Sequence, residues 1–205
     1  MSGSDVKSIL ITADANAADA DSVIAAQRPS TGATINGADA SGGAVEFTGA
    51  QIITATTTGT GDNEKTVTIT GTDVNGDAQT EVITHTGSAE TVNGAKFFKT
   101  VTAVDSSAQP AANITVGHLG TTVKAVVFKG RARLKGVMIV NSATAGTLDF
   151  VQTSTTGTSK MQLRSIADNE TSRDITVPEE GILFEDGAYL SYTLATFAFM
   201  TVFYA

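Results

Sequence analysis

Residues 65–85 read KTVTITGTDVNGDAQTEVITH, and this stretch decides the fold class. Its first half alternates Val67 and Ile69 with threonines, and this period of two predicts a strand with one buried face. A corner rich in Asp, Asn and Gly follows, and the second half returns as a strand of the same kind. We therefore expect an antiparallel hairpin here.

The corner of this hairpin invites comparison with a calcium-binding loop, because Asp73, Asn75 and Asp77 are spaced two residues apart. A calcium loop of the EF-hand type also needs glycine at its sixth position and glutamate at its twelfth. Counted from Asp73, those positions hold Ala78 and Thr84. We therefore predict a simple corner, in which Asn75-Gly76 supply positive φ angles and Asp73 caps the bend through its own side chain.

The composition of the whole chain agrees with this local pattern. It contains 33 threonines and 20 glycines, but only 6% aromatic and 17% charged residues, which suits solvated sheets joined by tight turns. Strand-like segments recur every ~8–12 residues, as in sandwiches and barrels. We predict an all-β fold of two small antiparallel β-sandwich or jelly-roll-like modules. Its parts are an extended N-terminal arm (1–30), an N-terminal β domain (31–120) and a C-terminal β domain (121–205).

Charge and cysteine content narrow the function classes. The net charge of −8 comes from residues 1–120, whereas residues 121–205 carry eight acidic and eight basic side chains. Binding to nucleic acid through phosphate neutralisation is not expected of such a chain. The absence of cysteine excludes disulfides and thiolate sites. Neither a signal peptide nor a membrane helix is evident, so we expect a soluble protein made in a cytoplasm, with no membrane partner.

Motifs for catalysis or cofactor binding are weak throughout. His85 and His118 lie 33 residues apart, and no Gly-x-Ser-x-Gly elbow is present. The segment TGTGDNEK lacks the Gly-Lys-Ser/Thr ending of a phosphate loop. The paired acids Glu179-Glu180 and Glu185-Asp186 fit solvated turns better than glycosidase carboxylates. We predict no enzyme activity, no catalytic, cofactor-binding or metal site, and no cofactor.

Two features stand out as candidate protein contacts. In KGRARLKG, the cations Lys129, Arg131, Arg133 and Lys135 alternate with small or apolar residues, which on a strand would place all four on one face. This basic stripe predicts either a solvated edge that blocks strand addition or an ionic contact with an acidic neighbour.

The C-terminal strand is the second candidate. Alternation would project Phe197, Phe199 and Phe203 from one face, and Met200, Val202 and Tyr204 from the other. A strand that is apolar on both faces must be covered on both. One cover is the core of its own domain, and the other is an opposing sheet or a subunit interface.

A set of turn and strand motifs in residues 67–117 is similar to a segment common in structural proteins of tailed bacteriophages. The matching motifs are Gly71-Thr72-Asp73, Asn75-Gly76, Thr80-Glu81, Phe98-Lys99-Thr100-Val101 and Val116-Gly117. Residues 22–47 look like the usual lead into this segment. Residues 130–150 and 177–193 look like a second phage module.

This resemblance implies a non-enzymatic component of a phage particle. Within that class it favours a capsid decoration (cement) protein, a homotrimer that binds the major capsid protein on the outer surface of the virion and stabilises the head shell. Such a protein is made in the cytoplasm of the host bacterium. The alternatives are a neck or tail component (head-to-tail adaptor, tail tube or short fibre), a surface carbohydrate-binding β module and, more remotely, a capsule depolymerase.

Overall fold

The structure is a computed structural model that describes residues 6–12, 18–120, 123–153, 157–169, 171–193 and 196–205. Every regular element in these ranges is a β-strand, which confirms the predicted all-β class. In chain order the strands are β1 (Lys7–Thr12), β2 (Asp19–Gln27), β3 (Ala40–Ser41), β4 (Ala44–Thr57), β5 (Thr66–Thr72), β6 (Ala78–Thr84), β7 (Glu90–Ser106), β8 (Ile114–His118), β9 (Val123–Phe128), β10 (Ala132–Asn141), β11 (Thr147–Gln152), β12 (Ser159–Arg164), β13 (Ser172–Thr176), β14 (Ile182–Phe184), β15 (Ala188–Tyr192) and β16 (Phe197–Tyr204).

The chain forms two compact units. The N-terminal unit is Asn16–Thr121, and the C-terminal unit combines Met1–Ala15 with Thr122–Ala205. The N-terminal unit is thus inserted between the first strand of the C-terminal unit and the rest of it.

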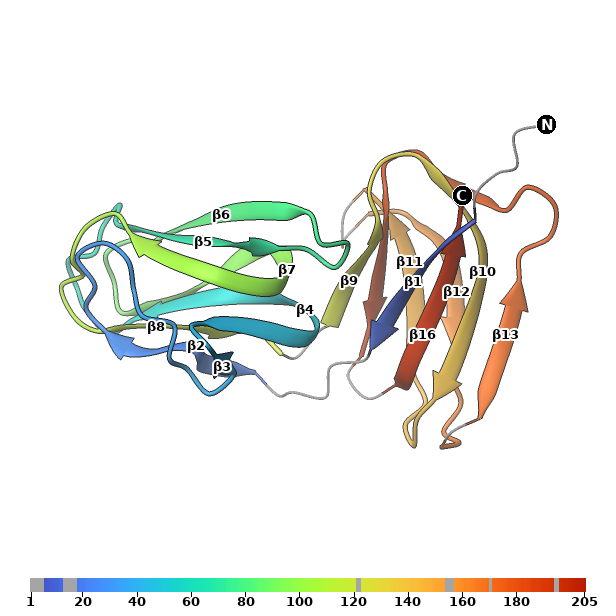
Figure 1. The fold of residues 1–205 in the computed structure, drawn as a ribbon, viewed down its shortest axis with the longest axis horizontal. Helices are drawn as coiled ribbons and strands as arrows, with labels where there is room; N and C mark the ends of the chain where they lie inside the picture. Colours follow the sequence, from blue (N-terminus) through green and yellow to red (C-terminus); the bar gives the residue numbers. More distant parts are fainter. Residues whose placement is uncertain (1–5, 13–17, 121–122, 154–156, 170, 194–195) are drawn as a thin grey trace. The chain divides into compact units, whose positions relative to one another are not determined.

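The C-terminal unit is a sandwich of two antiparallel sheets (Figure 1). One sheet has the order β1-β16-β10-β13, with β14 also paired to β10, and the other has the order β12-β11-β15-β9. Alternate residues of each strand point between the sheets, so Val137 and Ile139 of β10 and Leu148 and Phe150 of β11 are fully buried.

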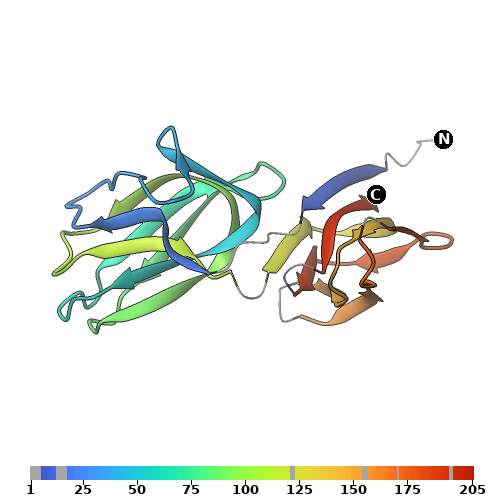
Figure 2. The same cartoon turned by 90° about the horizontal axis from the view of Figure 1, so that it is seen from below.

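Where the structure describes the first 30 residues, they do not form the expected extended arm. Residues 7–12 pair with β16 over six registered positions, and Figures 1 and 2 both show β1 (blue) beside β16 (red). Ile9 and Ile11 are buried, whereas Leu10 between them is 60% exposed. Residues 19–27 form β2, which pairs with β8 in the N-terminal unit. The sequence of residues 1–30 lacks an apolar helical face. Its short stretches of alternating apolar and polar residues are nevertheless enough to form strands once partner strands are present.

The N-terminal unit is built from one antiparallel sheet of seven strands, ordered β2-β8-β4-β7-β5-β6 with β3 paired to β4. Its two longest strands, β4 and β7, pair with each other and contain register shifts that bend the sheet, and Figure 1 shows β5 and β6 facing β8 and β2 across the interior. A single apolar cluster fills that interior, including Ile24, Ile53, Ile69 and Phe98, which are completely buried.

Candidate functional site

The corner between β5 and β6 is a hydrogen-bonded turn, as predicted. The Asp73 carboxylate accepts hydrogen bonds from the backbone N–H groups of Asn75 (2.9 Å) and Asp77 (3.0 Å), and the Gly76 N–H donates to the Asp73 carbonyl (3.0 Å). Asp73 is completely buried, so its side chain serves the backbone of the turn. Among residues 73–77 of this corner, only Gly76 has a positive φ, of 82°. The expectation that Asn75 shares this conformation is wrong, because a side-chain cap allows Asn75 an ordinary φ.

Behind this corner, β5 and β7 approach each other closely. The hydroxyls of Thr72 and Thr100 are 2.7 Å apart, and the Thr72 N–H donates to the Thr100 hydroxyl at 3.1 Å. A Cβ on Gly71 would collide with the Thr100 carbonyl. Gly71 therefore stands where a bulge brings the two backbones too close for any side chain.

Side chains close the gap between β6 and the first half of β7, two segments that the sheet ladder does not join. The Glu81 carboxylate accepts hydrogen bonds from the N–H groups of Ala95 (2.6 Å) and Lys96 (3.2 Å). In return, Lys96 Nζ donates to the Thr80 carbonyl (2.6 Å), and Gln79 Nε2 donates to the Phe97 carbonyl. We call this set of contacts the β6–β7 seam. Sequence reasoning missed it, because the Thr-Glu motif gives no sign of a partner across the sheet.

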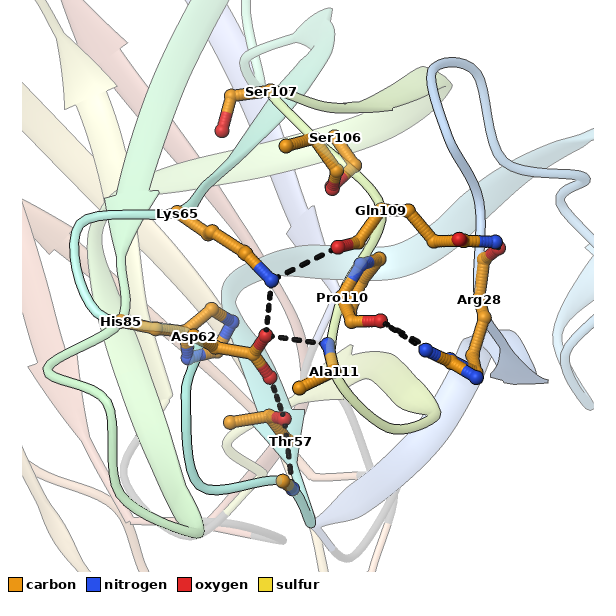
Figure 3. A network of polar contacts seen from close by, with 12 residues as sticks. Arg28, Thr57, Asp62, Lys65, His85, Ser106, Ser107, Gln109, Pro110 and Ala111 are labelled. Carbon is orange, nitrogen blue, oxygen red and sulfur yellow. Dashed lines mark hydrogen bonds and ion pairs between the residues drawn. The ribbon is translucent and has the colours of Figure 1, made fainter.

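A second polar network ties three loops together at one end of the N-terminal unit (Figure 3). Asp62 is 1% exposed and accepts hydrogen bonds from the Thr57 hydroxyl (2.7 Å), Lys65 Nζ (3.0 Å) and the Ala111 N–H (2.6 Å). Burial raises the pKa of Asp62, but the hydrogen bonds from Ala111, Thr57 and Lys65 outweigh it and hold the pKa at about 2.

The same network extends along the loop that follows β7. Lys65 Nζ also donates to the Gln109 carbonyl (2.9 Å), and the Arg28 guanidinium donates to the Pro110 carbonyl (2.8 and 3.1 Å). The TGTGDNEK segment thus supplies a buried structural carboxylate. Its donors come from this protein's own loops, and the arrangement holds the loops in place.

Both histidines are buried in the N-terminal unit, each 2% exposed. His85 Nδ1 lies 3.8 Å from Glu90 Oε1, and His118 Nε2 lies 3.6 Å from Asp39 Oδ2. Hydrogen bonds from the backbone N–H and hydroxyl of Thr86 lower the pKa of Glu90. No cluster of three or more potential metal ligands occurs in the part of the chain that the structure describes.

An open pocket of about 170 Å³ lies within the N-terminal unit. Its polar lining comes from Thr54, Thr91, Asn93 and His118, on β4, β7 and β8. Among its described lining residues only His118 is ionisable, so these walls offer hydrogen-bonding groups but no carboxylate.

The predicted basic stripe does not follow one strand face. Lys129 and Arg131 precede β10 in a turn where Gly130 has a φ of 71°, and the register with β16 shifts between Leu134 and Gly136, leaving Lys135 in a bulge. The expectation of four cations in one row is therefore wrong, because a turn and a bulge interrupt the period of two.

Acidic residues of the same unit lie against this stripe. Arg131 Nε donates to Glu185 (2.8 Å), Arg133 pairs with Glu180 (3.2 Å), and Lys135 Nζ donates to the Glu180 carbonyl (2.8 Å). The Arg131–Glu185 side chains are 65% and 56% exposed, so water screens their attraction. Glu180 and Glu185, one from each pair of acids, are thus local partners of the stripe. A role for the stripe in binding another protein stays a prediction.

The C-terminal strand also departs from simple alternation. The register with β10 passes from Val140↔Phe199 to Asn141↔Phe197, so Ala198 is an extra residue. Phe197 therefore points inward and is 1% exposed, whereas Phe199 is 38% exposed. The expected grouping of Phe197 with Phe199 and Phe203 is wrong, because the bulge at Ala198 places Phe197 on the opposite side of the strand.

The two inward aromatic residues of β16 pack against rings of the sandwich core. Phe197 lies 4.7 Å from Tyr192, and Tyr204 stacks on Phe128, with ring centroids 4.9 Å apart. Phe199 and Phe203 occupy the opposite, outer side of the strand. The strand is thus apolar on both faces, as its sequence predicts, but with a different division of residues.

Comparison with protein-family models, curated proteins and solved structures found no match to this chain. In the described residues no helical segment has the length and apolarity needed to cross a lipid bilayer.

Proposed function

We propose that this chain is a non-enzymatic structural protein of a bacteriophage particle, and specifically a capsid decoration protein that binds the major capsid protein on the outer shell. The observation that carries the proposal is the role of the residues behind the phage resemblance. Gly71-Thr72-Asp73 and Gly76 form the corner and close approach of β5, and Glu81 holds the β6–β7 seam.

The later motifs have equally architectural roles. Phe98 and Val101 are fully buried, and Lys99 Nζ donates to the Phe47 carbonyl. A Cβ on Gly117 would collide with the Asp19 carbonyl of β2. The residues that carry the phage resemblance thus form turns, hydrogen bonds between strands and close backbone contacts. These roles support a structural function for the N-terminal unit.

The charge distribution supports display on the outside of a particle. The N-terminal unit contains 11 acidic and four basic side chains, a net charge of −7, whereas the C-terminal unit has a net charge of −1. An acidic, threonine-rich unit suits a solvent-facing position, and the nearly neutral unit is better suited to contact with protein.

The first experiment is a count of copies per particle. Purified particles of the phage that encodes this chain are digested, and labelled reference peptides quantify the chain against the major capsid protein. We expect a ratio near one to one. A dozen or fewer copies would assign the chain to the neck or tail, and absence from the particle would reject a virion role. Binding on a glycan array would favour the carbohydrate-binding alternative.

A further inference from the structure

One outer face of the C-terminal sandwich is unusually apolar. It belongs to the sheet β1-β16-β10-β13, and three cross-strand rows make it up: Ser8, Phe203, Gly136 and Thr176; Leu10, Thr201, Met138 and Asp174; Thr12, Phe199, Val140 and Ser172. We call these twelve residues the outer face. Five of its members are large and apolar, and they adjoin one another across three neighbouring strands.

The other sheet of the same sandwich serves as an internal reference. There the outward row through the centre includes Asp149, Gln162 and Ser191, as expected of a face in water. Five large apolar side chains are exposed among the described residues, and Leu10 (60%) and Phe199 (38%) are two of them. A third, Val6 (54%), immediately precedes β1 and stands two residues before Ser8. Exposed apolar groups thus concentrate at one face, which marks an interaction surface.

We propose that the outer face binds the same face of a second copy of this chain. The charges argue for that occupant. Asp174 is the only ionisable residue of the outer face. The face therefore offers no cation to an acidic partner and only one carboxylate to a basic partner. The C-terminal unit has a net charge of only −1, so contact between two copies of this unit brings little like charge together, whereas two N-terminal units, at −7 each, would repel.

A two-fold axis parallel to the strands suits this face. Such an axis reverses the strand order of the partner, so that β1 of one copy covers β13 of the other. The two Asp174 carboxylates then lie at opposite rims, where water can solvate them. Phe199, Thr201 and Phe203 of β16 lie over β10 of the partner, which presents Met138 and Val140. Aligned sheets packed ~10 Å apart have this arrangement in β-sandwiches.

The size of the face sets the expected affinity. Four strands at ~4.8 Å spacing and about five residues at ~3.3 Å rise give roughly 300 Å², well below the ~800 Å² per partner of a standard interface. We therefore expect weak, reversible pairing, with a dissociation constant between about 10 µM and 1 mM. The pairing does not depend on the particle role, since it is a property of the isolated chain.

Sedimentation velocity from about 5 µM to about 1 mM tests the proposal. We expect the wild-type mass to rise from monomer toward dimer. The double variant Leu10→Ser/Phe199→Ser should remain monomeric, because it removes the two most exposed apolar members of the face. Val82→Ser is the matched control: Val82 is 58% exposed on β6 of the N-terminal unit, and its loss should leave the pairing unchanged.

A second pair of variants tests the same face by adding a charge, without removing an apolar side chain. Thr201→Lys places a cation at the centre of the outer face, and Ser191→Lys places one at the centre of the polar face on the other sheet. Only the first should abolish pairing, and circular dichroism should show both folded. A wild-type chain that stays monomeric at about 1 mM overturns the proposal. So does association that survives Leu10→Ser/Phe199→Ser, or a mass that settles at trimer, the state implied by the phage resemblance.

Discussion

The carboxylate of Glu81 occupies the space in which a side chain at Gly94 would begin, since a Cβ added to Gly94 would collide with it. Glu81 can reach the N–H groups of Ala95 and Lys96 only because residue 94 has no side chain. The two residues therefore act together in closing the β6–β7 seam of the N-terminal unit.

Replacing either residue should open the seam. We expect Glu81→Ala to lower the free energy of unfolding of the N-terminal unit by about 1–3 kcal/mol, because two backbone N–H groups lose a charged acceptor. Gly94→Ala should have a similar effect, because it displaces the carboxylate. The double variant should lose less than the sum, with a coupling of about 1 kcal/mol or more. Urea denaturation measures all three.

Glu46→Ala is the control for this cycle. Glu46 is 74% exposed and lies 3.7 Å from Lys99, so its loss should change stability little. Strict additivity of Glu81→Ala and Gly94→Ala would contradict the shared role of the two residues.

The Asp62 network predicts a dependence of stability on acid pH. The folded pKa of about 2 lies below the ordinary value of 3.8, so the carboxylate stabilises the fold fully above about pH 5 and loses that effect as the pH falls through 4 toward 2. The shift corresponds to about 2 kcal/mol. Asp62→Asn should be less stable than wild type at pH 7 and should lose this part of the acid dependence.

Urea denaturation at pH 7, 4 and 2.5 measures this effect, with Glu46→Gln as the exposed control. Equal losses of stability between pH 4 and 2.5 in wild type and Asp62→Asn would show that another carboxylate is responsible.

The hairpin corner was predictable because its causes are local. Asn75-Gly76 and the capping Asp73 lie within a few residues, and turn chemistry depends on such short offsets. The all-β class was predictable for the same reason, since threonine content and period-two alternation are read one segment at a time.

The bulges and the non-local pairings were not predictable from the sequence. Ala198 reverses the facing of Phe197 only because β10 continues past it in another register. Likewise β1 acquires its role from β16, at the opposite end of the sequence. The sequence of residues 7–12 does not indicate which strand they pair with, because pairing between such distant segments depends on the assembled core.

The corner between β5 and β6 can be tested directly for calcium binding. Asp73→Ala should destabilise the N-terminal unit by about 1–3 kcal/mol, because two N–H groups of the turn lose their buried acceptor. Gly76→Ala should cost about 1 kcal/mol, because the φ of 82° is unfavourable for alanine. Addition of millimolar calcium, compared with EDTA, should leave the melting temperature of the wild type unchanged. A rise in melting temperature with calcium that is absent in Asp73→Ala would show that the corner binds the metal.

The discontinuous C-terminal unit leads to the most direct test of the fold. Ile11 is 2% exposed in the sandwich core, so Ile11→Ala should destabilise the C-terminal unit by about 2–4 kcal/mol, whereas Leu10→Ala, one residue away at 60% exposure, should have little effect. The chain contains its own probes for this experiment. All three tyrosines, Tyr189, Tyr192 and Tyr204, belong to the C-terminal unit, and both histidines belong to the N-terminal unit.

Tyrosine fluorescence therefore follows the unfolding of one unit, and the histidine ring signals in proton NMR follow the other. Ile11→Ala should shift the tyrosine-detected transition and leave the histidine-detected transition in place. The opposite pattern would mean that the first strand belongs with the residues that follow it in sequence. A shift in both transitions would mean that the two units unfold together. An unchanged tyrosine transition would return residues 7–12 to the extended arm that the sequence alone suggests.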